Sequence, residues 1–365
     1  MQATSHSLTS SACSVKPSAY LVNPVFDLLF VCGGLILALV ATALYFGGGN
    51  FTAAKEQPVT FAIGLVGAIL IGEPHSAATL FRLYGEGQNL RRFKFIAFVL
   101  PIILAMLGIA ALTCPPLIAY IASIYLVLTI HHTLAQSYGI TKMYCGRASY
   151  ILPRHDHFLL KAIMWTAVTA SALQLFSPGW QRAAFHGVPV FWMPLFTEPM
   201  VNTARLLLLG LVALLLGKQA IAIVKGQQCM PLPAMATTLF SLLIFAQVRP
   251  VSELIWLFIP AFFHGSQYLS VTMALFLNQR QTSDREDRPV QLRQKIDAIA
   301  FRYVSLLLSA ITLFWIVPWI ISRAGPSFVT CSALVLLLVS LHHFVADAYL
   351  WRLRDKSNSP LLQSA

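Results

Sequence analysis

Histidine is the side chain that stands out in this sequence, because six of its ten copies lie inside long apolar stretches. Such stretches predict membrane-spanning helices, and an ionisable side chain within the hydrocarbon layer is rare and usually functional. Imidazole binds transition metals and also relays protons. The six residues are His75, His131, His132, His264, His342 and His343.

Each histidine-bearing segment also carries polar side chains three or four positions further on, which places them on the same helix face. The pairs are His75 with Thr79, His132 with Gln136, His264 with Gln267 and Tyr268, and His343 with Asp347. A metal-bound histidine usually donates its second ring N–H to a neighbouring polar group. These neighbours are therefore suited to orient ligands, and Asp347 is also suited to bind a metal directly.

The elements that must position these residues are predicted from apolar length. A transmembrane helix needs about 20 mostly apolar residues. The segments that meet this rule are 24–47, 58–80, 95–113, 116–140, 158–176, 201–224, 232–248, 250–277, 299–322 and 328–350. The sequence therefore predicts an all-α, polytopic transmembrane helix bundle of about ten helices.

Composition agrees with a membrane protein and excludes several other classes. Of the 365 residues, 57% are hydrophobic and only 10% are charged, whereas soluble domains carry roughly 25% charged residues. The net charge of +12 is dispersed between apolar runs, so we expect no nucleic-acid partner. The six cysteines form no CxxC pair, which argues against a thiolate metal site or a disulfide framework.

Basic residues give the bundle an orientation. With both termini cytoplasmic, 20 of the 25 Lys and Arg residues fall on the cytoplasmic side, as the positive-inside rule requires. The other side holds Lys55, Arg182, Arg205, Arg249 and Arg323. In this orientation the second, fourth, eighth and tenth helices all run inward, and each carries its histidines in its cytoplasmic half. Four helices thus direct imidazole at one layer of the membrane.

The domain organisation follows from the same pattern. Residues 1–23 form a polar N-terminal tail, 24–350 a single transmembrane domain with a cytosolic loop at 278–298, and 351–365 a cytosolic C-terminal tail. We expect a multi-pass protein of a bacterial inner membrane.

The shared depth of the histidines favours one metal or cofactor site over a proton or ion pathway, and over separate structural histidines. Neighbours in a doublet point about 100° apart, so which member of each doublet faces the site stays open. Imidazoles with a carboxylate suit iron, zinc or copper. Oxidation of an apolar substrate that enters from the membrane needs activated dioxygen, which side chains alone do not supply, so we expect non-haem iron.

Four segments carry a resemblance to a known family: EPHSAATLFRLYG, TIHHTLAQSYGITKMY, FHGSQYLSVTM and LHHFVADAYLWRLRD. They resemble the histidine segments of the bacterial membrane β-carotene dioxygenases that form retinal, which are histidine-rich integral-membrane oxygenases. The resemblance implies an iron site whose ligands are His75, His132, His264 and His343.

The resulting hypothesis is a membrane oxidoreductase that uses dioxygen on a hydrophobic lipid or isoprenoid-type substrate. Its partners are membrane lipids and an electron-donor protein. Asp347 and Gln136 would orient ligands or complete the shell, while Tyr138, Gln267 and Tyr268 would line the substrate pocket. Two alternatives stay open: a haem held by histidines from facing helices, and a proton-coupled transporter or permease.

Overall fold

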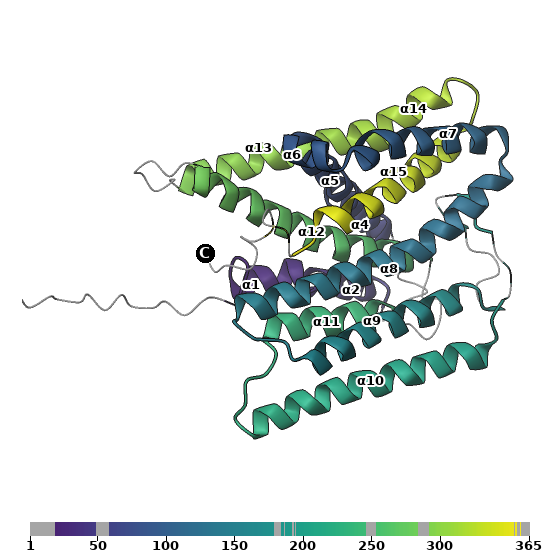
Figure 1. The fold of residues 1–365 in the computed structure, drawn as a ribbon. Helices are drawn as coiled ribbons and strands as arrows, with labels where there is room; N and C mark the ends of the chain where they lie inside the picture. Colours follow the sequence, from purple (N-terminus) through teal and green to yellow (C-terminus); the bar gives the residue numbers. More distant parts are fainter. Residues whose placement is uncertain are drawn as a thin grey trace, which may run out of the picture.

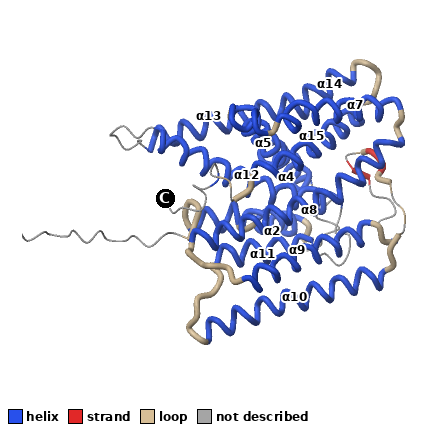
Figure 2. Tube along the Cα trace, viewed as in Figure 1, coloured by secondary structure: helices blue, strands red, loops and turns tan. Residues whose placement is uncertain are grey.

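The computed structural model describes residues 19–48, 58–178, 184–185, 187–191, 193, 195–245, 253–283, 292–353, 355 and 358. In these ranges helices make up nearly all of the regular structure (Figure 2). The strands present there are β1 (Ala184–Phe185) and β2 (Val188–Pro189), which pair antiparallel. The predicted all-α class is confirmed.

The helices follow the expected apolar segments. They are α1 (Pro24–Phe26), α2 (Gly34–Phe46), α4 (Pro58–Gly67), α5 (Glu73–Gly85), α6 (Gly87–Arg92), α7 (Leu100–Thr113), α8 (Pro116–Arg147), α9 (Arg154–Leu175), α10 (Glu198–Val224), α11 (Leu232–Phe245), α12 (Glu253–Ser283), α13 (Leu292–Ile311), α14 (Val317–Ser322) and α15 (Phe328–Leu350). Short π-helical segments join some of them, at Asp27–Val31, Ala68–Gly72, Phe95–Val99 and Thr312–Ile316.

Seven helical stretches of the described chain are long and apolar enough to cross a membrane, or eight if the bent pair Pro24–Val31 and Gly34–Phe46 is one span. This confirms a polytopic helical bundle, with fewer clear spans than the ten expected. Two of the ten expected segments, 232–248 and 250–277, are not among these spans. They correspond to α11, which has 14 residues, and α12, which has 31.

The expected cytosolic loop at 278–298 falls between the two helices α12 and α13 and includes an end of each. Helix α12 continues to Ser283 and α13 begins at Leu292, so helices occupy both ends of the segment, and 284–291 lie outside the described residues. Of the two tails, 1–18 and most of 354–365 also lie outside them. Asn358 is described, and its side chain is fully buried.

The long helices run side by side, with α9 between α8 and α10 at one edge of the bundle (Figure 1). Four helices meet near the middle: α5 and α8 each pack against both α12 and α15. Each of these four helices carries one or two of the intramembrane histidines. The packing therefore brings together segments that are more than 250 residues apart in the sequence.

The first span is broken at Gly33, which has a φ of +99° and marks a bend of 59°. A Cβ atom at Gly33 would lie 2.1 Å from the Phe240 ring of α11, so only glycine fits. The break leaves the Val31 carbonyl to accept a hydrogen bond of 2.8 Å from the Gln267 side chain of α12. The bend thus ties the first span to a helix that carries a site histidine.

Gly33→Ala should destabilise the protein, because it adds a left-handed backbone penalty of about 1–2 kcal/mol to a steric overlap with Phe240. We expect a lower midpoint of thermal unfolding in detergent, followed by circular dichroism. Gly210→Ala is the control, since a Cβ atom there meets nothing within 4 Å. Equal midpoints for the two variants would contradict the account of the bend.

Candidate metal centre

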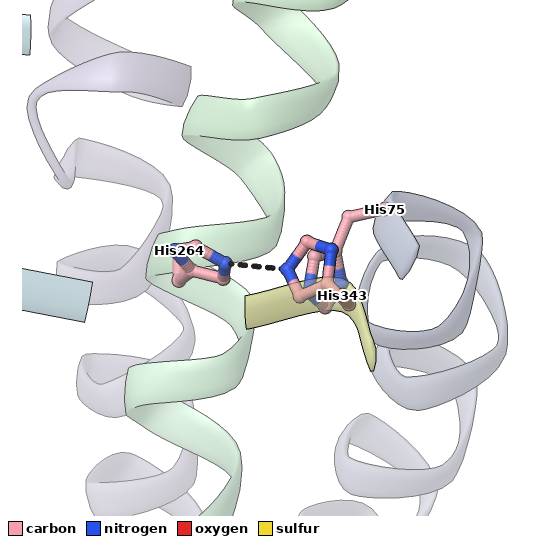
Figure 3. Close-up of side chains that lie close together, drawn as sticks. All are labelled: His75, His264 and His343. Atoms are coloured by element: carbon pink, nitrogen blue, oxygen red, sulfur yellow. Dashed lines mark hydrogen bonds between the residues drawn. The ribbon is translucent and has the colours of Figure 1, made fainter. Parts of the chain in front are cut away.

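Four of the six intramembrane histidines come together in the centre of the bundle. They are His75 of α5, His132 of α8, His264 of α12 and His343 of α15, and we call them the four-histidine cluster. Figure 3 shows three of them, with the rings of His264 and His343 directed at each other. His132 is partly buried, and the other three are buried.

The rings are spaced as they would be around one ion. Ring centroids lie 4.9 Å apart for His75 and His264, 4.9 Å for His75 and His343, and 4.9 Å for His132 and His343. The His132–His264 spacing is 4.6 Å, and His264–His343 is 5.8 Å. With a metal–nitrogen bond of about 2.1 Å, ring centroids should lie about 4.5 Å apart at right angles and about 5.2 Å apart in a tetrahedron.

Nitrogen spacings agree with the ring spacings. The Nε2 atom of His343 lies 3.1 Å from Nε2 of His132 and 3.5 Å from Nε2 of His264. Two nitrogens bound to one ion at about 2.1 Å are separated by about 3.0 Å at right angles and about 3.4 Å in a tetrahedron. The spacing around His343 is therefore what a shared ion would allow. Among the described residues, the possible ligand atoms that lie within 4.8 Å of one another form two overlapping groups, His75–His264–His343 and His132–His343–Asp347, which share His343.

Buried polar atoms without partners point to the same place. The Nδ1 atoms of His75 and His264 and the Oδ2 atom of Asp347 are buried and have no hydrogen-bond partner. Asp347 Oδ2 lies 3.5 Å from Nε2 of His343 and 3.7 Å from Nε2 of His132. Since buried polar atoms are nearly always satisfied, an ion bound to Asp347 would account for its orphaned Oδ2 atom.

Thr79 sets the tautomer of His343. Its hydroxyl donates to Asp347 Oδ1 at 2.8 Å, and its oxygen lies 2.8 Å from Nδ1 of His343. Because the single hydroxyl proton goes to the carboxylate, the contact with His343 requires that Nδ1–H donates to the threonine. The lone pair of His343 is then on Nε2, which faces the other histidines, as metal binding needs.

A hydrogen-bonded layer continues from Asp347 to Trp351. The Tyr268 hydroxyl donates to Asp347 Oδ1 at 3.0 Å, and the Trp351 indole N–H donates to Tyr268 at 2.9 Å. The guanidinium of Arg82 stacks on Trp351, 3.9 Å from the ring centroid, and also bonds to Asn358. This layer closes one side of the four-histidine cluster.

The other members of the two doublets lie elsewhere. His342 Nε2 is 2.9 Å from the Ile96 carbonyl, to which it donates. The His131 ring lies 5.0 Å from that of Trp165 on α9. Both positions follow from the rotation of about 100° between adjacent helical residues.

The two predicted glutamines join helices without reaching the cluster centre. Gln136 donates to the His264 carbonyl at 3.0 Å and to the Gln267 side chain at 3.1 Å, and Gln267 donates to Val31. Gln136 therefore fixes the backbone that carries His264. Tyr138 faces α9, where its hydroxyl lies 3.1 Å from Nδ1 of His157.

An apolar cavity of about 640 Å³ adjoins the cluster. Its polar wall includes His132, Gln136, Tyr268 and Asp347, and most of the remaining wall is apolar side chains of α7, α8 and α15. His131 also lines it, whereas Tyr138 and Gln267 do not. A volume of this size accommodates a drug-sized or larger organic molecule.

Sequence reasoning missed the roles of Thr79, Arg82 and Trp351. Thr79 was paired with His75 by its spacing, but the structure places its hydroxyl against His343 on another helix. A hydroxyl residue at a buried helix position was the available signal. Nothing in the spacing of Arg82 and Trp351 indicates that the two side chains stack.

Comparison with known proteins adds no further guide to this site. No protein-family model, no curated protein and no solved structure matches the chain.

Thr79→Val should weaken divalent-metal binding by about 10- to 100-fold, because His343 and Asp347 lose the group that orients them. Thr79→Ser keeps the hydroxyl and should bind nearly as the parent does. Competition with a chromophoric chelator measures the affinity. Thr203→Val, which alters an exposed hydroxyl on α10, is the control, and a loss of similar size there would refute the assignment.

Proposed function

We propose that this chain is a membrane-embedded, non-haem iron oxygenase or oxidase that acts on a hydrophobic, lipid- or isoprenoid-type substrate. One observation carries the proposal: two overlapping groups of possible metal ligands, which share His343, adjoin a large apolar cavity. The cluster supplies ligands for a metal, and the cavity supplies space for an apolar molecule beside it. The resemblance to retinal-forming dioxygenases supports the same class.

The donor set suits a borderline transition metal. Imidazoles with one carboxylate suit iron, zinc or copper, and no cysteine belongs to the ligand groups found in the described part of the chain. Iron, when bound, supplies the activation of dioxygen that attack on C–H or C=C bonds requires. Side chains of this chain hold the ion and place the substrate.

The same spacing favours a single ion over a haem. Axial nitrogens on the two faces of a haem iron are about 4 Å apart, with the macrocycle between them. The Nε2 atoms of His132 and His343 are 3.1 Å apart, and His75 and His264 flank them. This arrangement has no slot for a porphyrin.

The cavity wall supports an uncharged substrate. No Lys or Arg belongs to its described lining, whereas Asp347 does, so a carboxylate or phosphate group would find no counter-charge there. Leu128, Val345 and Tyr349 line the cavity and are also exposed on the outside of the bundle. An apolar molecule can therefore enter from the lipid, between α8 and α15.

Within the site, the residues divide into ligands and orienting groups. His75, His132, His264 and His343 bind the ion, and Thr79 orients His343. Asp347 lines the cavity, and its Oδ2 is free to approach an ion beside His132 and His343, because Thr79 and Tyr268 occupy its Oδ1. Asp347 is thus the group best placed to move a proton at the substrate.

Purified protein should contain about one iron per chain, and His343→Ala should lose it while keeping its helical content. His342→Gln is the matched control, because His342 is the adjacent histidine but bonds to Ile96 outside the cluster. Elemental analysis measures the iron content, and circular dichroism of the same samples measures the helical content. Protein that is active without any metal would end the proposal.

Gly139→Phe should block the cavity, because Gly139 lines it and a Cβ atom there meets nothing within 4 Å. With β-carotene as a neutral isoprenoid probe, we expect at least a tenfold loss of bound pigment, measured by absorbance, and no loss of iron. Gly210→Phe on α10 is the control. Equal pigment binding by both variants would show that the cavity is not the substrate site.

A further inference from the structure

Two residues singled out in the sequence, His131 and Tyr138, lie outside the four-histidine cluster and on the side of α8 that meets α9. His131 contacts Trp165, and Tyr138 contacts His157. Both partners belong to α9. These contacts mark a surface between the two helices, formed by Tyr138, Lys142, His157, Lys161 and Trp165, which we call the α8–α9 seam.

Positive charge is concentrated on this seam. The Lys142 ammonium lies 5.7 Å from the centroid of the Tyr138 ring. Nδ1 of His157 lies 3.1 Å from the Tyr138 hydroxyl, and Lys161 follows His157 by four residues on the same face of α9. Three basic side chains from two helices therefore share a small region around one tyrosine.

No acidic side chain balances this charge. Among the ion pairs of the described residues, none includes Lys142, His157 or Lys161. Asp156 follows His155 directly in sequence, but Lys218 and His155 engage its carboxylate. Like charges at short range repel unless an anion lies between them, so the seam is a site that an anion would stabilise.

The positive-inside rule explains why lysines occur at these helix ends, but it does not require them to gather. Lys94 and Lys225 satisfy the rule as exposed residues without an ion pair in the described chain. Lys142 instead lies against the Tyr138 ring, and Lys161 lies one helical turn along α9 from His157, which contacts the Tyr138 hydroxyl. Their arrangement resembles the basic pockets between helices that hold lipid head groups.

Apolar surface continues from the basic group toward the membrane interior. Trp165 follows Lys161 by four residues on the same face of α9, and it is 53% exposed. His131 lies against it from α8. A ligand that fits this surface has an anionic head at the lysines and an apolar chain along Trp165.

We propose that the α8–α9 seam binds one anionic phospholipid of the cytoplasmic leaflet. Its phosphate lies between Lys142 and Lys161, with the Tyr138 hydroxyl as a further donor, and its acyl chain follows Trp165. The site is separate from the four-histidine cluster and does not depend on the function proposed for it.

The test is native mass spectrometry of the full chain in neutral detergent with dioleoyl phosphatidylglycerol or dioleoyl phosphatidylcholine. The parent protein should retain one phosphatidylglycerol in preference to phosphatidylcholine. Lys142→Gln/Lys161→Gln should weaken this binding by about fivefold for each lysine. Lys94→Gln/Lys225→Gln removes the same charge from the same side of the protein and should bind as the parent does.

Three results would overturn the inference. The first is no preference for phosphatidylglycerol in the parent protein, and the second is an equal loss in both double variants, which would indicate only diffuse attraction. The third is competition by inorganic phosphate at the same concentration as the lipid, which would assign the seam to a free anion. Each variant should elute from a size-exclusion column at the same volume as the parent protein and give the same circular dichroism spectrum. These two controls exclude misfolding as the cause of lost binding.

Discussion

The convergence of four imidazole rings, with His343 in contact with the other three, governs the structure near the candidate site. Each ring belongs to a different helix, so α5, α8, α12 and α15 must pack with the correct rotation and depth. In an interior of low dielectric constant, polar atoms without partners are strongly unfavourable. A bound ion would satisfy the orphaned Oδ2 atom of Asp347, and it would join helices that otherwise associate through weak apolar contacts.

Close backbone contact makes this convergence possible. A Cβ atom at Gly265, next to His264, would lie 2.9 Å from the Ile71 carbonyl and 3.4 Å from Nδ1 of His75. A Cβ atom at Gly67 would overlap the Phe262 ring. Glycines on both helices thus let α12 approach the span that carries His75, as small residues do at membrane helix interfaces. The hydrogen bond from Gln136 to the His264 carbonyl fixes α12 from the other side.

The helical class and the presence of several spans were predictable, because apolar length is a strong and local signal. The cluster was partly predictable for a similar reason, since hydropathy and basic residues placed His75, His132, His264 and His343 at one depth. The depth of a residue in the membrane does not tell which way its side chain points around the helix axis. Spacing alone therefore could not show that His132 and His343, rather than His131 and His342, face the cluster. Their separation depends on contacts with Trp165 and Ile96, which are tertiary.

Interhelical contacts also explain the errors. Thr79 shares a helix face with His75, and only the approach of α15 to α5 reveals that it serves His343. Tyr138 is two residues from Gln136, which turns it by about 200° and directs it to α9.

The order in which the four ligands are synthesised has a consequence for biogenesis. His75 lies in the second apolar segment and His343 in α15, the last helix of the chain. During translation, the earlier helices insert while their imidazoles still lack the final ring and the carboxylate of Asp347. An ion bound as we propose is held fully only after α15 has entered the membrane, so capture of that ion would report completion of the bundle, and a chain truncated before α15 would bind it weakly.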